Sequence, residues 1–233
     1  MKVVAIVPAR SGSKGLPGKN IAQVGDKTLL ELAVNVGKNS QLVDDVFVST
    51  DDPIYEQMAL KAGARSLGLR PLELSGDSTK TWEVLHEMIP HFETQYDFIV
   101  LLQPTSPVRE PEEIDQMIRM LDESIHDSCV AVYTVDEPSP YKMKRIDDRG
   151  MVVPLMANTS SEIPRQELPT VYSLSGAIYV TRITSLLTYK NILGNASIPY
   201  ITPKGPNIDS EEDLIYLRFL RSHMGLDVYG AGN

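Results

Sequence analysis

The chain has 233 residues, of which 42% are hydrophobic and 23% are charged, and its formal net charge is −9. This length allows a full hydrophobic core, and the acidic balance excludes the extended basic surface that nucleic-acid binding needs, so no nucleic-acid partner is expected. Its single cysteine, Cys129, excludes an internal disulfide, and no apolar run is as long as a membrane span or a signal-peptide core, which predicts a cytoplasmic protein without a membrane partner.

Short β-branched runs alternate with amphipathic stretches from the start of the chain to about residue 135. Strands are predicted at residues 3–7, 46–50, 64–69, 98–102 and 129–135. Helices are predicted after a Thr28 and Glu31 capping box, after an Asp52 N-cap followed by Pro53, around Trp82, and over residues 111–121. Because the predicted strands are almost continuously apolar, they favour an α/β fold with a mainly parallel sheet.

The loop after the first predicted strand, residues 9–20, reads Ala-Arg-Ser-Gly-Ser-Lys-Gly-Leu-Pro-Gly-Lys-Asn. Residues 1–25 contain four cations and no acid, which leaves −13 on the remainder of the chain. An α/β sheet usually opens its ligand crevice at such a loop, so the pattern indicates a small polyanion such as a nucleoside triphosphate. The spacing of Gly12 and Gly18, followed by Lys19 and Asn20, is not that of a Walker A loop. A solvated surface turn is the alternative interpretation.

The pattern changes after Pro138. Residues 138–170 contain five prolines and two weak strand-like pieces, at 142–146 and 151–155. The α/β pattern then resumes with strands at 176–180 and 198–202, a helix near Ser185 and a last helix from Ser210 to about His223. The sequence therefore predicts a nucleotide-binding α/β core over residues 1–137, an extended arm over 138–170, and a return to the core over 171–233.

Two further segments carry chemistry. Gln103 follows the most apolar strand and precedes a Pro-Thr-Ser-Pro turn, which places it near the predicted crevice, although a simple helix-capping turn is an alternative. Asn207 and Asp209 alternate with Ile208, so in an extended segment both face one side, where they could ligate a divalent cation together with phosphate oxygens. For Asp209, a role in starting the last helix stays equally open.

Taken together, segments along almost the whole chain resemble the acylneuraminate cytidylyltransferases, which are the CMP-sialic acid synthetases and their nonulosonate relatives. The matching segments are residues 9–20, 48–51, 69–71 with 73–74, 101–109, 164–166 with 168–169, 176–179, and 208–209 with 213–214. The resemblance implies a mononucleotide-binding, three-layer α/β fold with a mainly parallel sheet. It also implies that residues 138–170 form a small dimerisation arm that reaches into the partner's active site, and hence a homodimer.

The resemblance further implies the reaction: the anomeric hydroxyl of a nine-carbon keto-acid sugar attacks the α-phosphate of CTP and releases pyrophosphate, with Mg²⁺ required. The implied nucleotide contacts are Arg10, Ser11, Gly12, Lys14, Lys19, Asn20, Arg70 and Thr81. The implied sugar contacts are Gln103 and Tyr179, with Lys142 and Arg165 from the second subunit. Asp209 and Asn207 are the implied metal ligands, and Lys19, Arg10 and Asp209 are predicted to carry catalysis.

Three departures from the family pattern bear on the substrate. Asn207 stands where an aspartate is usual, Ser173 and Ser175 replace an arginine and an asparagine, and Ile192 with Leu193 replaces paired phenylalanines beneath the acyl group. The first difference predicts a reduced metal affinity, and the second predicts that a phosphate or carboxylate contact is missing or supplied elsewhere. The third favours a sialate relative such as legionaminate or pseudaminate.

Two rival functions remain open from the sequence. A Kdo cytidylyltransferase performs the same chemistry on an eight-carbon acid, but that family has arginine at the Lys14 position and lacks the Gln-Pro-Thr-Ser-Pro segment. A noncatalytic CTP-binding protein would keep the cationic loop, and the weakened acidic motif at Asn207 gives this alternative some support.

Overall fold

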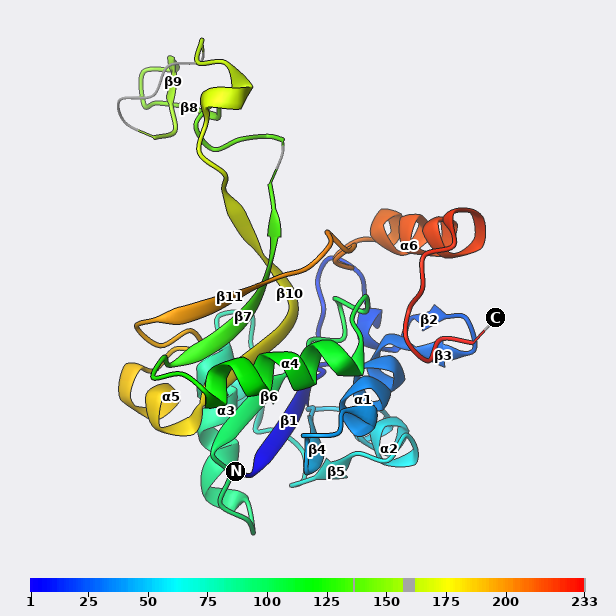
Figure 1. Ribbon diagram of the computed structural model, residues 1–233. Helices are drawn as coiled ribbons and strands as arrows, with labels where there is room; N and C mark the ends of the chain where they lie inside the picture. The colour runs from blue at the N-terminus through cyan, green and yellow to red at the C-terminus, as the bar shows by residue number, and fades with distance from the viewer. Residues whose placement is uncertain (136, 157–161, 233) are drawn as a thin grey trace.

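The computed structural model describes residues 1–135, 137–156 and 162–232, without the side chain of Arg165. A seven-stranded sheet lies between two helical layers (Figure 1), with the strand order β11-β7-β10-β6-β1-β4-β5. Every neighbouring pair in it is parallel except the two pairs that involve β10. The predicted α/β fold with a mainly parallel sheet is therefore confirmed.

The strands of this sheet are β1 (Val3–Pro8), β4 (Asp45–Ser49), β5 (Arg65–Ser66), β6 (Phe98–Leu101), β7 (Ser128–Thr134), β10 (Tyr172–Arg182) and β11 (Ser197–Ile201). Two hairpins lie outside it, β2 (Gln23–Val24) with β3 (Lys27–Thr28) and β8 (Lys144–Ile146) with β9 (Val152–Pro154). The α-helices are α1 (Leu29–Asn39), α2 (Pro53–Lys61), α3 (Thr81–Met88), α4 (Pro111–Asp122), α5 (Ile183–Tyr189) and α6 (Glu211–Met224). Short 3-10 helices span Lys19–Ile21, Leu72–Leu74, Ile89–His91 and Arg165–Glu167.

The alternation of side chains along β1 explains the two helical layers. Val3, Ala5 and Val7 pack in one buried cluster with residues of α1, α2 and α4, whereas Val4 and Ile6 belong to a second cluster with residues of α3 and α5. All five side chains are fully buried. A strand covered on both faces needs apolar residues at every position, which is the continuous pattern seen in the sequence.

The local signals for helix ends are also confirmed. Thr28 and Glu31 form a reciprocal capping box at α1, the Asp52 carboxylate accepts from the first amides of α2, and Ser210 forms a capping box with Asp213 at α6. Ile208, just before α6, is fully buried in a third cluster that includes residues of α1 and α6. This burial anchors the segment that carries Asn207 and Asp209.

Strand β10 differs from its prediction. A short strand over 176–180 was expected, but β10 spans eleven residues and runs antiparallel to both β6 and β7. Its pairing with β7 shifts register between Leu174 and Tyr179, around Gly176, whose φ is +77°. Because β10 is reversed, its first half lies at the same edge of the sheet as the carboxyl ends of β1, β6, β7 and β11.

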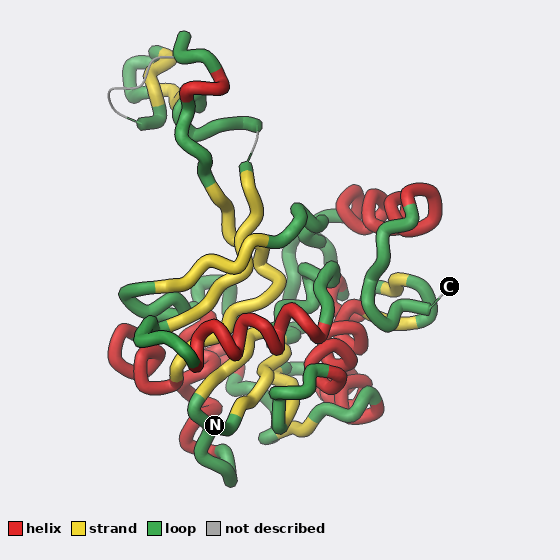
Figure 2. Tube along the Cα trace, viewed as in Figure 1, coloured by secondary structure: helices red, strands yellow, loops and turns green. Residues whose placement is uncertain are grey.

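The chain between β7 and β10 projects away from the sheet (Figure 1), and the tube in Figure 2 shows the two strands leaving it together. The β8–β9 hairpin lies in this projection, at shorter bounds than the predicted pieces 142–146 and 151–155. Ile146 and Val152 of the hairpin are 74% and 69% exposed. The segment thus leaves apolar side chains uncovered within a single chain.

Two remaining expectations concern the whole chain. Among the residues described, no helix combines the length and the apolar character that crossing a membrane requires. Cys129 is buried in β7, and burial raises the pKa of its thiol to about 12. A thiol in that state is a core residue and a poor nucleophile at neutral pH.

Candidate active site

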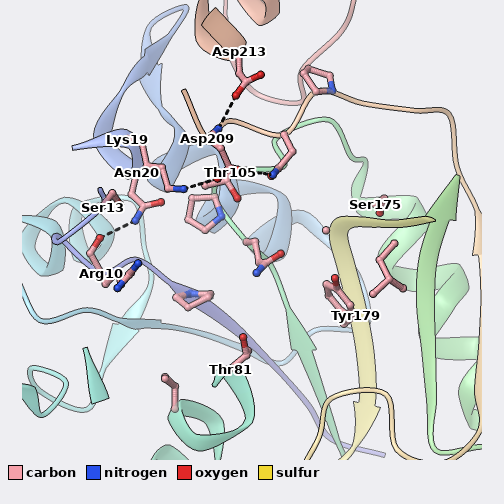
Figure 3. Close-up of a pocket in the computed structure, with 18 of the residues that line it drawn as sticks. Arg10, Ser13, Lys19, Asn20, Thr81, Thr105, Ser175, Tyr179, Asp209 and Asp213 are labelled. Carbon is pink, nitrogen blue, oxygen red and sulfur yellow. Dashed lines mark hydrogen bonds and ion pairs between the residues drawn. The ribbon is translucent and has the colours of Figure 1, made fainter. Parts of the chain in front are cut away.

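A cavity of about 710 Å³ opens at the sheet edge where β1, β6 and β7 end and β10 begins (Figure 3). The residues predicted for the site that line it are Arg10, Lys19, Asn20, Arg70, Thr81, Gln103, Tyr179, Asn207 and Asp209. These residues come from six separate segments of the chain, so the fold brings together residues that are far apart in the sequence. Ser11, Gly12, Lys14, Lys142 and Arg165 are not among its lining residues.

The backbone of the cation-rich loop packs closely against the segment that carries Asp209. A Cβ added at Gly15 would lie 2.5 Å from the Asp209 carbonyl oxygen, so only glycine fits there without movement. Gly18 has a φ of +71° and precedes the 3-10 turn that presents Lys19 and Asn20. The buried Asn20 amide donates to the Arg10 carbonyl at 2.9 Å. The cation-rich loop is therefore packed and hydrogen-bonded against the rest of the chain, unlike a solvated surface turn.

The three cations of the loop each meet a carboxylate. Arg10 Nη1 lies 2.8 Å from one oxygen of Asp77, and Lys14 Nζ lies 2.5 Å from the other. Lys19 Nζ lies 2.7 Å from Asp209 Oδ1. Hydrogen bonds from Lys14 and then Arg10 hold the pKa of Asp77 below its usual range. A polyanion that enters the cavity can replace Asp77 as the partner of two cations.

Ser11 and Gly12 occupy the outer part of the loop. Both the amide and the hydroxyl of Ser11 donate to the Asp51 carboxylate, at 2.8 and 3.0 Å. Ser11 thus ties the loop to the end of β4. A Cβ at Gly12 would meet nothing within 4 Å, so this position of the loop is open to solvent or a ligand. Lys14 is 84% exposed and reaches the cavity only through Asp77, which lines it.

Arg70 is fixed beside the cavity by β4. Its Nε donates to Ser49 Oγ at 3.0 Å and its Nη2 donates to the Ser49 carbonyl at 2.6 Å. Burial lowers the pKa of this guanidinium. Thr81, the first residue of α3, lines the same wall. Both predicted nucleotide contacts therefore line the cavity.

The turn after β6 is held by Arg109, which sequence reasoning treated only as the end of a motif. Its Nη1 donates to the carbonyls of Gln103 at 2.9 Å and Ala177 at 2.6 Å, and burial lowers its pKa to about 9, so it stays charged at neutral pH. A Cβ at Gly176 would lie 2.7 Å from Ser106 Oγ and 3.3 Å from Gln103 Oε1. The turn and the irregular part of β10 therefore form one packed unit.

Asn207 and Asp209 lie side by side, as the alternation predicted. Asn207 Nδ2 donates to Asp209 Oδ2 at 2.7 Å, and Ser106 Oγ donates to Asn207 Oδ1 at 3.0 Å. No group of three or more His, Cys, Asp or Glu side chains is arranged for a metal within the described residues. The oxygens of Asp209 and Asn207 suit a hard divalent cation, provided that a bound phosphate completes its coordination.

Asp213 belongs to the start of α6, although it also borders the cavity. Its Oδ2 accepts from the amides of Asp209 at 3.0 Å and Ser210 at 2.8 Å, and from the Ser210 hydroxyl at 2.9 Å. These hydrogen bonds, first that from Asp209, hold the pKa of Asp213 below its usual range. The carboxylate thus fixes the backbone under Asp209 (Figure 3).

The two residues expected from a second subunit lie in the projection. Lys142 donates its amide to the Ser139 carbonyl at 2.9 Å and does not line the cavity of its own chain. Arg165 begins a 3-10 helix, and its side chain is outside those described. A single chain therefore does not bring Lys142 to the site.

Sequence reasoning missed several residues that line the cavity, among them Asp77, Tyr133, Lys204 and Tyr216. Lys204 follows the predicted strand 198–202 in a Pro-Lys-Gly-Pro turn, and a residue just after a parallel strand belongs to the crevice edge. That signal was present for Lys204. For Asp77 and Tyr216, spacing in the sequence gives no such signal.

Comparison with known proteins identifies relatives over most of the chain. An N-acylneuraminate cytidylyltransferase of Streptococcus agalactiae serotype III (strain NEM316) is 30% identical over 221 residues, which is 93% of this chain and 52% of the relative. The chain thus spans about half the length of that protein. A CMP-N,N'-diacetyllegionaminic acid synthase of Legionella pneumophila subsp. pneumophila is 29% identical over 204 residues, covering 86% of this chain and 87% of the relative.

A solved structure of CMP:2-keto-3-deoxy-manno-octonic acid synthetase complexed with CTP superposes with a TM-score of 0.72 at 20% identity. The superposition covers 96% of this chain and 100% of that one, which establishes the shared fold. The family model described as "Cytidylyltransferase" matches residues 4–162, which include both the cation-rich loop and the turn after β6. Because that match covers more than half of the sequence, the chain belongs to the cytidylyltransferase family.

Proposed function

We propose that the protein transfers CMP from CTP to the anomeric hydroxyl of a nine-carbon keto-acid sugar. The hydroxyl oxygen bonds to the α-phosphorus, the bond to the bridging oxygen of the β-phosphate breaks, pyrophosphate leaves, and the hydroxyl proton passes to water. The observation that carries the proposal is the cavity itself. Arg10, Lys19 and Asp209 lie toward one end of it, and Tyr179 lies toward the other (Figure 3).

The cationic end suits the triphosphate. Arg10 and Lys19 face the cavity, and Lys14 can approach it once Asp77 is displaced. Fixed cations that face the departing pyrophosphate stabilise the charge that develops on it, since they need no reorganisation during the reaction. Arg70 and Thr81 border the same end and would contact the nucleoside.

Asp209 and Asn207 would hold the Mg²⁺ ion. When bound there, the ion would withdraw charge from the phosphate oxygens and so make the α-phosphorus more electrophilic. Lys19 contacts Asp209 Oδ1, while Asn207 contacts Asp209 Oδ2, so this carboxylate is already oriented from both sides. Its orientation supports a role at the junction between phosphate and sugar.

The opposite end suits a polyhydroxylated sugar acid. Gln103 and Tyr179 line it, and Arg109 fixes the Gln103 backbone. Burial raises the pKa of Tyr179, so its hydroxyl stays protonated and can both donate and accept a hydrogen bond. The names of the two relatives support a nonulosonic acid. Ile192 and Leu193, which were expected beneath the acyl group, do not line the cavity. Their carbonyls accept from Thr181 and Ser128 at the opposite edge of the sheet, so they carry no argument about the sugar.

A second copy of the chain would complete the site. The apolar side chains of the β8–β9 hairpin are exposed, which supports its burial against a partner, and Lys142 and Arg165 would then approach the partner's cavity. Mixing an Arg165→Ala protein with an Asp209→Ala protein tests this, because hybrid dimers should contain one intact site. Absence of restored activity after confirmed subunit exchange would contradict a shared site.

Pyrophosphate release from CTP and Mg²⁺ tests the reaction across N-acetylneuraminate, legionaminate, pseudaminate and Kdo. We expect release with at least one nine-carbon acid. Release with Kdo alone would assign the eight-carbon reaction, and CTP binding without release from any acid would assign a noncatalytic nucleotide-binding protein.

A further inference from the structure

Two cations in the cavity, Arg70 and Lys204, form no ion pair within residues 1–135, 137–156 and 162–232. Arg10 pairs with Asp77, Lys19 pairs with Asp209, and the Arg70 guanidinium is held by Ser49. Lys204 also lines the cavity, and its ammonium group lies 5.7 Å from the centroid of the Tyr133 ring. An aromatic face orients an ammonium group but leaves its charge and hydrogen-bond donors available.

The sheet places Lys204 far from the phosphate loop. Tyr133 is near the carboxyl end of β7, and Lys204 follows β11, the edge strand beside it. Strands β10 and β6, which carry Tyr179 and lead to Gln103, lie between β7 and β1. Lys204 and the cation-rich loop are therefore on opposite sides of the predicted sugar contacts.

The backbone around Lys204 is fixed on both sides. The Thr202 amide donates to the Val132 carbonyl at 2.8 Å, beside Tyr133. A Cβ at Gly205 would lie 3.1 Å from the Val108 Cβ, and the Ile208 amide donates to the Thr105 carbonyl at 2.7 Å. The backbone at Lys204 is therefore held in place, and its flexible side chain can extend from this fixed position into the cavity.

We propose that Lys204 binds the carboxylate of the keto-acid sugar. This rests on the proposed function, in which the triphosphate occupies the opposite end and the sugar acid lies beside β10. The carboxylate is the one ionised group that every sugar of this class carries. Ser173, directly opposite Tyr133 in the β7–β10 ladder, supplies no charge, so among the described residues of its own chain Lys204 is the cation that lines this end.

Steady-state kinetics of Lys204→Met test the proposal. Loss of a charge-assisted hydrogen bond should raise KM for the sugar acid by about 10- to 100-fold, with KM for CTP unchanged. Lys204→Arg should restore most of the affinity, since it keeps the charge. Lys61→Met is the matched control, because Lys61 is exposed at the end of α2 and does not line the cavity.

The methyl ester of the sugar acid identifies the group that is bound. Wild type should prefer the free acid to the ester, and Lys204→Met should lose about tenfold or more of that preference. An unchanged preference in Lys204→Met, or a rise in KM for CTP alone, would overturn the role of Lys204 while leaving the proposed reaction intact. Absence of turnover by wild type with every nine-carbon acid would overturn both.

Discussion

At one end of the cavity three cations come from a single loop of twelve residues, each of these three meets a carboxylate, and the backbone is packed at Gly15. At the other end the side chains come from the ends of β6, β7, β10 and β11, and Lys204 lacks a carboxylate partner in the part of the chain that the structure describes. The first end depends on backbone shape and is hard to vary. The second depends on side chains that can change while the sheet stays the same.

The largest effect is expected from Lys19→Ala, at the loop end. Removing a charge donor that faces the departing pyrophosphate should lower kcat by about 100-fold, in line with deletion of other preorganised donors. Pyrophosphate release measures it, and Lys38→Ala, on the far part of α1, is a control for loss of a surface lysine. Near-normal turnover would remove Lys19 from the chemistry.

Gly15→Ala should damage the loop end through the backbone. Its Cβ would meet the Asp209 carbonyl at 2.5 Å, so the loop must move, and overpacking of this kind costs about 1–3 kcal/mol. Calorimetry should show CTP affinity reduced by about tenfold or more. Gly12→Ala is the matched control, because its Cβ meets nothing within 4 Å. Equal effects of the two substitutions would contradict the packing argument.

Gly176→Ala should weaken binding of the sugar acid rather than binding of CTP. The new Cβ approaches Ser106 Oγ at 2.7 Å and Gln103 Oε1 at 3.3 Å, at a φ of +77°. We expect KM for the sugar acid to rise by about tenfold while KM for CTP changes little, since displacement of a packed polar group costs about 1–2 kcal/mol. Gly68→Ala, at a φ of +99° with open space around it, controls for backbone strain alone. If CTP binding suffers as much as sugar binding, the two ends are not independent.

The smallest effect is expected from Asp77→Asn. An exposed ion pair contributes little, so removing this competitor for Arg10 and Lys14 should tighten CTP binding by about two- to fivefold. The lowered pKa of Asp77 keeps it ionised through neutral pH, so the difference from wild type should vanish only as the pH falls through that lowered value. Calorimetry at several pH values measures it. Weaker binding by Asp77→Asn would instead assign Asp77 to positioning Arg10.

The cation-rich end of the cavity and the starts of the helices could be predicted, because their signals lie within a few residues of one another in the sequence. The caps at Thr28, Asp52 and Ser210 follow from hydrogen bonds within a few residues, and the alternation around Ile208 was enough to place Asn207 beside Asp209. Strands that are buried on both faces are likewise visible in the sequence as continuous apolar runs.

The strand arrangement at the other end could not be predicted, because strand direction and register are set by distant partners. An apolar run over 176–180 is compatible with either direction, so the antiparallel β10 and its irregularity at Gly176 had no local signal. The buried Arg109 has its partners in two separate carbonyls that only the folded sheet brings together. The roles of Lys142 and Arg165 stay predictions, because they depend on a second chain.

The ladder between β7 and β10 has one further consequence. Beyond Val132, where β11 ends its pairing, Tyr133 and Thr134 pair only with Ser173 and Tyr172. This two-stranded segment forms the cavity wall beside Lys204, and it is also the base of the projection that carries the β8–β9 hairpin. Two-stranded ribbons carry more twist than wide sheets, so the direction of the hairpin and the position of Tyr133 depend on the same two strands.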